Sequence, residues 1–268
     1  YQQIVVNDNN RFMKCALSFL GLEDHNDVIG ITPVSKQNKS QREEEAENIR
    51  KIRAYSDACT YVHRCALNLE EGMENCGLEA NMLIKAHSIL CSYDSESYKN
   101  ARSRFRNEDD GLIIIGRGIF NPVPGELVQP RIDRLFLMYN NDWYNENTLV
   151  KGVKFMLEYI RIQPHLDGNK RVGLMALNFI LEKDGFPAIY LSSKEYDEFV
   201  SLVEDCIISR NITPLVGLVS KYVTKAQNTY YDDILIYRIN KKINRLEGKN
   251  EPFEDTSLNH SDEEPEME

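Results

Sequence analysis

The segment RIQPHLDGNKRVGLMALNFIL, residues 161–181, places a cluster of polar residues directly ahead of an apolar helix. Gly168 and Asn169 tolerate left-handed backbone angles, so the loop can turn its N–H groups inward as an anion-binding nest. The helix that follows adds the positive end of its dipole, and Lys170 and Arg171 add full charges. This combination predicts that the loop binds a phosphate group.

An acidic residue, Asp167, stands immediately before this nest. It is a candidate Mg²⁺ ligand, because Mg²⁺ typically binds through one or two carboxylates together with the phosphates of the substrate. The residues alone also allow a plainer interpretation, in which the loop is an ordinary connection between two helices and Asp167 caps the second of them.

The hydrophobic periodicity along the chain predicts a mostly helical protein. The segment 172–181 is apolar nearly all round, which is typical of a helix surrounded by other helices. The β-branched, glycine-bounded run at 111–120 predicts a short strand or hairpin. The helices are expected over residues 41–67, 78–91, 127–139, 147–162, 172–181, 193–209 and 213–226, with a further one near 231–246.

The motif IQPHLDGNKRVG resembles the signature of the Fic/Doc family, which usually reads His-Pro-Phe-x-Asp/Glu-Gly-Asn-Gly/Lys-Arg. The residues FR at 105–106, LIII at 112–115 and FNPVP at 120–124 are also similar to the part of this family that precedes the signature. The resemblance covers about residues 60–226. It implies a Fic-fold helical bundle with a small β-hairpin flap.

Proteins of this family typically move AMP from ATP onto a hydroxyl side chain of a target protein. The resemblance therefore implies ATP and Mg²⁺ as cofactors and a target protein with a modifiable hydroxyl as partner. By position, Asp167 would hold the metal, and the flap would align the target chain by strand-like pairing. The phosphate-binding residues would be Gly168, Asn169, Lys170 and Arg171, and those of the flap Ile114, Ile115 and Gly116.

The sequence departs from the family at the catalytic position. Gln163 stands where the family has the histidine that acts as general base, and an amide cannot take a proton from a hydroxyl. A general base typically contributes a factor of about 10²–10⁴, so the usual transfer should be impaired. His165, at the position of the family's Phe, is either a displaced base or a packed histidine. Both a weak or altered transferase and a non-catalytic protein that binds nucleotide or a partner are therefore expected outcomes.

Two further departures concern the transferred group. Lys170 replaces the last glycine of the nest, and Leu174 stands where AMP-transferring members usually have a second Arg. Both are similar to the Doc-type branch, which transfers phosphate. Upstream, MENCGL resembles the family's inhibitory helix and makes Glu74 the inhibitory residue, although an acidic turn without this role is an equal alternative.

Charge and composition limit which other classes of function are expected. The formal net charge is −10, but the last eighteen residues hold eight Asp or Glu, which leaves the first 250 residues close to neutral. Such a body lacks the basic footprint of a nucleic-acid-binding protein. No apolar run approaches the length of a membrane span. Six cysteines without a CxxC pair favour a cytoplasmic protein with reduced thiols.

The expected organisation has four parts. Residues 1–59 form an N-terminal helical extension, 60–226 the Fic domain, 227–250 a C-terminal helix and 251–268 an acidic disordered tail. The C-terminal helix carries a stripe of isoleucines. This stripe would pack either on the domain or on a second copy of the chain, which would make a homodimer.

Two Cys–His pairs at a spacing of four are also found in the sequence. They place their thiol and imidazole groups on one helix face, and would make a zinc site if the pairs met. Buried free thiols and hydrogen-bonded histidines are the plainer alternative. The pairs are Cys59 with His63 and His87 with Cys91.

Overall fold

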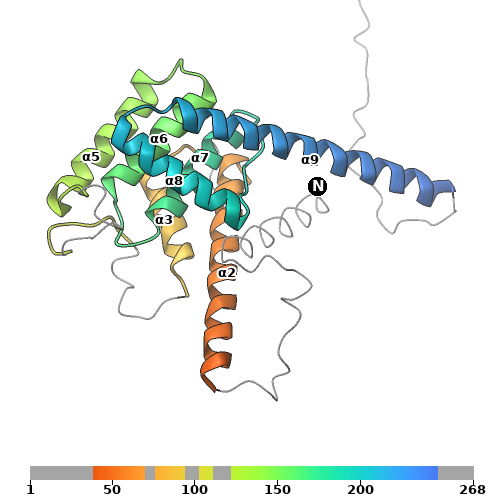
Figure 1. Ribbon diagram of the computed structural model, residues 1–268, viewed down its shortest axis with the longest axis horizontal. Helices are drawn as coiled ribbons and strands as arrows, with labels where there is room; N and C mark the ends of the chain where they lie inside the picture. Colours follow the sequence, from red (N-terminus) through yellow and green to blue (C-terminus); the bar gives the residue numbers. More distant parts are fainter. Residues whose placement is uncertain (1–38, 70–75, 94–102, 111–121, 247–268) are drawn as a thin grey trace, which may run out of the picture. The chain divides into compact units, whose positions relative to one another are not determined.

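The computed structural model describes residues 39–69, 76–93, 103–110 and 122–246, and this part of the chain is mostly helical, as predicted (Figure 1). The hairpin flap expected at 111–120 lies outside the described residues. The helices are α2 (Lys39–Ala66), α3 (Ala80–Leu90), α5 (Gly125–Leu137), the π-helical turn η4 (Met138–Asp142), α6 (Thr148–Ile162), α7 (Asn169–Lys183), α8 (Ser193–Ser209) and α9 (Thr213–Leu246).

Helix α7 lies at the centre of the bundle, where it packs against α6, α2 and α3 (Figure 1). Every residue from Val172 to Leu181 is buried, which explains why this segment is apolar nearly all round. One face of α6 and α7 joins an apolar cluster with α2, α3 and α5, and another joins a cluster with α8 and the start of α9. The loop that connects α6 to α7 is therefore fixed between two helices of the core.

The helix boundaries differ from the sequence predictions mainly in α7 and α9. Helix α7 begins at Asn169, three residues before the apolar run, because Gly168 takes the N-cap position. Helix α9 is continuous from Thr213 to Leu246, where the sequence suggested two helices; no Gly or Pro stands between 218 and 246 to end it.

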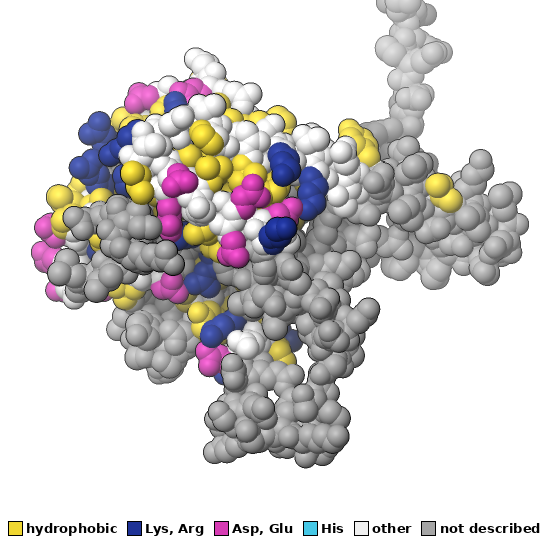
Figure 2. All heavy atoms as spheres, in the orientation of Figure 1, with side chains coloured by type: hydrophobic (Ala, Val, Ile, Leu, Met, Phe, Trp, Pro, Cys, Tyr) yellow, Lys and Arg dark blue, Asp and Glu magenta, His cyan; other side chains and the backbone are white. Residues whose placement is uncertain are grey.

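The chain divides into two compact units, residues 1–226 and 227–268. Within the part that the structure describes, no helix combines the length and the apolar character that crossing a bilayer requires. The face drawn in Figure 2 carries acidic and basic side chains interspersed with apolar ones.

Candidate functional site

The connection between α6 and α7 is shaped by two residues with left-handed backbone angles. Gln163 ends α6 with φ 52° and ψ 60°, and Gly168 precedes α7 with φ 81°. A left-handed conformation is uncommon for a residue with a side chain and persists where the surroundings hold it. The loop is thus a tight structure whose geometry depends on what holds Gln163.

The side chain of Gln163 forms its hydrogen bonds with neighbouring residues of the same connection. Its amide Nε2 donates to the Ile160 carbonyl at 2.6 Å, and its Oε1 accepts from Asn169 Nδ2 at 2.8 Å. The residue is only 5% exposed. Position 163, which the motif resemblance implies to be that of the general base, therefore holds a buried, uncharged amide whose nitrogen and oxygen each have a hydrogen-bond partner.

The side chain of Asn169 stabilises the loop through hydrogen bonds. Its Nδ2 donates to Gln163 Oε1 and to the His165 carbonyl, both at 2.8 Å, and its Oδ1 accepts from the His165 backbone N–H at 2.8 Å. Sequence reasoning expected Asn169 to bind phosphate. In this structure its amide is directed at the loop, so a contribution to anion binding would come from its backbone N–H.

His165 is fully buried and lies inside a shell of aromatic rings. Its Nε2 is 2.8 Å from the Tyr159 hydroxyl, and its ring stacks on that of His87 with centroids 3.6 Å apart. Burial, followed by the proximity of His87, lowers the pKa of His165 well below its ordinary value. The imidazole is therefore neutral, and it is packed where no substrate hydroxyl can come within hydrogen-bond distance without a rearrangement of the loop.

His87 holds the loop from α3, a role that the sequence did not reveal. Its Nε2 donates to the Asp167 carbonyl at 2.9 Å, and Cys91 Sγ lies 3.4 Å from the same nitrogen. A carbonyl oxygen can only accept, so Nε2 carries the proton. Among the described residues no group of His, Cys, Asp or Glu is arranged to bind a metal ion, so of the two alternatives for the Cys–His pairs the structure favours free thiols and hydrogen-bonded histidines.

The charged residues of the loop are paired within the protein. Asp167 Oδ2 is 2.9 Å from Arg171 Nη2, and Lys170 Nζ is 2.8 Å from Glu204 Oε1 on α8. Burial lowers the pKa of Arg171, but the charge of Asp167 and weaker contributions from nearby residues raise it by more, so the net shift is upward. The four groups of these two pairs together carry no net charge, so a phosphate that bound Lys170 or Arg171 would compete with the carboxylate already paired to it.

The start of α7 nevertheless fits an anion. Gly168 has no side chain to cap the helix, so the first-turn N–H groups receive no side-chain hydrogen bond from the N-cap residue. Asp167 has a side chain that is 80% exposed, whereas that of Arg171 is 19% exposed. One exposed carboxylate suits Mg²⁺ only if phosphates supply further ligands, so the residues fit a metal–nucleotide complex better than a free metal ion.

Leu174 is the residue that the motif resemblance implies to stand in place of a second arginine. It is buried in the cluster that α6 and α7 form with α8 and the start of α9. The candidate site therefore contains one arginine on α7, Arg171. The predicted inhibitory residue Glu74 and the flap residues Ile114, Ile115 and Gly116 lie outside the described residues.

Gly168 provides a test of how tightly the loop is packed. A Cβ at this position would lie 3.2 Å from Leu90 Cδ2 and 3.4 Å from His87 Cδ2, whereas a Cβ at Gly185, which has φ 83°, would meet no atom within 4 Å. We expect Gly185→Ala to lower the free energy of unfolding by about 1–2 kcal/mol, through backbone strain alone. Gly168→Ala should lower it by more, because the added Cβ would also crowd its neighbours. Urea unfolding of the two variants measures the difference, and equal losses would contradict the packed geometry.

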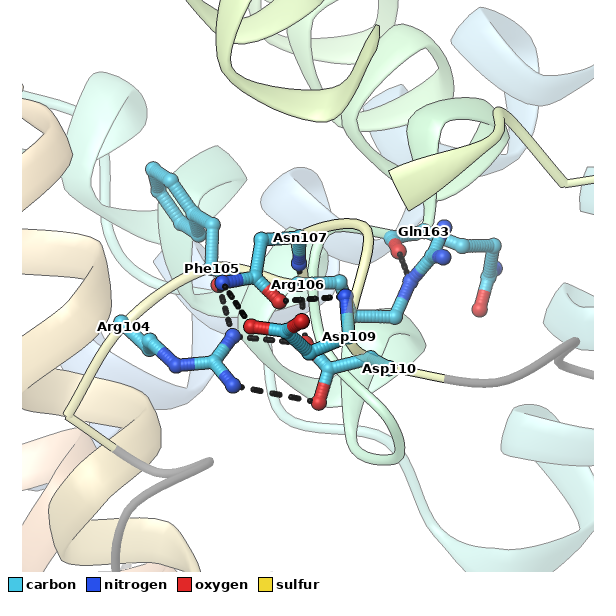
Figure 3. Close-up of polar contacts among 7 residues, drawn as sticks. All are labelled: Arg104, Phe105, Arg106, Asn107, Asp109, Asp110 and Gln163. Atoms are coloured by element: carbon cyan, nitrogen blue, oxygen red, sulfur yellow. Dashed lines mark hydrogen bonds and ion pairs between the residues drawn. The ribbon is translucent and has the colours of Figure 1, made fainter. Parts of the chain in front are cut away.

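Arg106 is a second group that the sequence did not single out for chemistry. It is 5% exposed, and its Nε donates to the Gln163 carbonyl at 2.8 Å, as Figure 3 shows. Its backbone N–H donates to the Pro164 carbonyl at 2.7 Å. In the sequence, the pair FR at 105–106 was noted as similar to the family that the motif resembles, but no role was assigned to Arg106.

Comparison with known proteins agrees with this architecture. Residues 77–181 match the model of the Fic/DOC family. A search of curated proteins finds no match. The chain is similar in structure to a Fic-domain-containing signaling protein from Bacteroides thetaiotaomicron, with TM-score 0.64 and 14% identity, over 84% of this chain and 88% of that one.

Two further solved structures are similar. Fic-1 from C. elegans has TM-score 0.62 and 15% identity, over 86% of this chain and 64% of that one. A Fic family protein from Desulfovibrio desulfuricans has TM-score 0.56 and 19% identity, over 83% of this chain and 66% of that one. This chain therefore spans slightly less than two thirds of these two proteins. At such identities the similarity establishes the fold alone, so the chain has the fold of these Fic-domain proteins, and its residues 77–181 match the Fic/DOC family.

Proposed function

We propose that this Fic-domain protein binds the phosphates of ATP at residues 167–171 and that it transfers AMP or phosphate to a protein hydroxyl weakly or not at all. The proposal is supported by the N-terminus of α7, which has no side-chain cap and lies beside Arg171. It is also supported by Gln163, whose hydrogen-bonded amide stands at the expected catalytic position. The first feature favours anion binding, and the second removes the general base.

Binding would exchange internal partners for the ligand. Arg171 would release Asp167 and pair with a phosphate, and Asp167 would be free to bind Mg²⁺. Bound there, Mg²⁺ would neutralise phosphate charge and orient the nucleotide. The backbone N–H groups at the start of α7 would supply further donors, because Gly168 gives them no side-chain cap. The chain's own contribution is thus binding and orientation, without a proton acceptor at position 163.

A second candidate is a pseudoenzyme that binds a protein partner and no nucleotide. The pairing of Lys170 with Glu204 and of Arg171 with Asp167 favours it, because these contacts already satisfy the cations that a nucleotide would need. Calorimetric titration with ATP distinguishes the two candidates.

The test uses ATP with Mg²⁺ on the wild-type chain, on Arg171→Ala and on Arg161→Ala. Arg161 is the matched control, because its guanidinium pairs with Glu158 within α6. We expect binding to the wild type and the control, and an affinity at least about tenfold lower for Arg171→Ala, since charge-assisted hydrogen bonds contribute about 1.5–3 kcal/mol. Absence of wild-type binding would refute the proposal.

The transfer arm of the same test uses ATP labelled at the α- or the γ-phosphate. Label on the chain from the α-phosphate alone would identify AMP as the transferred group, and label from the γ-phosphate alone would identify phosphate. We expect little or no label on the chain from either phosphate, because Gln163 supplies no general base.

A further inference from the structure

Arg106 is a buried cation whose hydrogen bonds go to carbonyl oxygens. Its Nε donates to the Gln163 carbonyl at 2.8 Å and its Nη2 donates to the Val123 carbonyl at 2.7 Å, with the Ile162 carbonyl at 3.5 Å. No ion pair of the described part of the chain includes it. Burial lowers the pKa of Arg106, although the charge of Asp110 acts in the opposite direction. Burying a cation without a carboxylate costs free energy, so the contacts it makes call for an explanation.

These contacts join three separate segments of the chain. Arg106 belongs to 103–110, Val123 stands just before α5, and Gln163 ends α6. The last carbonyls of a helix have no partner within it, and a cation at the helix C-terminus is also favoured by the helix dipole. The guanidinium therefore caps α6 at the residue where the chain turns left-handed.

The segment 103–110 also touches the loop through the neighbouring side chain. The ring of Phe105 lies 5.2 Å from that of His165, and the backbone N–H of Arg106 donates to the Pro164 carbonyl. Three consecutive loop residues, 163–165, are thus held from one segment. Asn169 then connects Gln163 and His165 to the first residue of α7.

Arg104 provides an internal contrast in the same segment. Its guanidinium donates to Asp110 at 2.6 and 3.2 Å, and Figure 3 shows it directed at the 107–110 turn while Arg106 extends away toward Gln163. The two arginines lie two residues apart and carry the same charge. Of the two guanidinium groups, only that of Arg106 hydrogen-bonds to the α6–α7 loop among the described residues, whereas Arg104 approaches the loop through its backbone, near His165.

We propose that Arg106 is a positioning residue for the phosphate loop: by capping α6 at Gln163, it fixes the backbone that presents the N–H groups of residues 168–171. The inference rests on the proposed nucleotide binding for its functional consequence. Arg106 acts through the backbone and does not itself contact the ligand. Lysine should not replace it, because an ammonium group lacks the planar fork that spans separate carbonyls.

The test compares Arg106→Lys, Arg106→Met and Arg104→Met in the full chain. Hydrogen exchange of residues 163–171 reports the loop directly, with α8 as an internal reference, and calorimetry with ATP and Mg²⁺ reports the site. Both are measured well below the melting temperature of each variant. Arg106→Lys keeps the charge and the alkyl chain, so it remains informative if the methionine variant does not fold.

We expect both Arg106 variants to exchange at least about tenfold faster over 163–171 and to bind ATP at least about tenfold more weakly, as loss of charge-assisted hydrogen bonds implies. Arg104→Met should leave both quantities within about twofold of wild type, in line with the small effect of a partly exposed ion pair. Full binding by Arg106→Lys would show that only its charge matters and would overturn the proposal.

Two other outcomes are also decisive. Unchanged exchange in both Arg106 variants overturns the inference, and so does faster exchange with unaltered affinity, because Arg106 would then be merely structural. If the wild-type chain binds no nucleotide, the proposed function fails, and exchange alone then judges whether Arg106 positions this loop.

Discussion

Replacing Gln163 with histidine is expected to raise the transfer of AMP or phosphate from ATP by about 10²–10⁴-fold, the usual contribution of a general base. The position already ends α6 with its backbone fixed by Arg106. Histidine is also among the residues that tolerate left-handed backbone angles. The measurement is incorporation of label from α- or γ-labelled ATP into the chain itself.

The pH dependence of this gain identifies its origin. The neutral imidazole is the base, so activity of Gln163→His should rise as the pH increases through about 6.5, the ordinary pKa of histidine. Gln163→Asn is the matched control, because it keeps an amide and should remain inactive. Retained ATP binding without any gain in Gln163→His would contradict a latent transferase and favour a binding protein.

The second large effect concerns stability. A Cβ at Gly125 would lie 1.9 Å from the Asn107 carbonyl oxygen and 2.4 Å from its carbon, a separation that no side chain can have. The Asn107 backbone N–H donates to Asp110 at 2.8 Å, so the turn resists displacement. We expect Gly125→Ala to lower the free energy of unfolding by about 3 kcal/mol, at the upper end of overpacking costs.

Gly217 supplies the control for this substitution. It lies in α9, and a Cβ there would meet no atom within 4 Å. Gly217→Ala should raise the free energy of unfolding by about 0.5–1 kcal/mol, because alanine is the better helix former. Denaturant unfolding measures both variants, and a loss below about 1 kcal/mol for Gly125→Ala would show that the contact with Asn107 is not rigid.

Most of the fold could be read from the sequence because its signals are local. The periodicity of 147–162 and the uniformly apolar 172–181 predicted the two central helices, and the structure places both at the core. The break of α9 was predicted wrongly, since polar residues near 227–232 do not end a helix that lacks Gly or Pro.

The candidate site was only partly predictable. The sequence by itself determined that position 163 has no titratable side chain and that position 174 is apolar, because these are matters of residue identity. It could not say that Asn169 braces the loop or that Arg171 pairs with Asp167. Such pairings depend on side-chain direction at the turn.

Only the tertiary structure decided which distant groups hold the loop. His87 on α3 bonds the Asp167 carbonyl, and Arg106 bonds the Gln163 carbonyl, across separations of 80 and 57 residues. Both acceptors are main-chain oxygens, which every residue type possesses, so no sequence pattern marks them. They become specific sites because burial removes water as a partner and each such oxygen must find a donor within the folded chain.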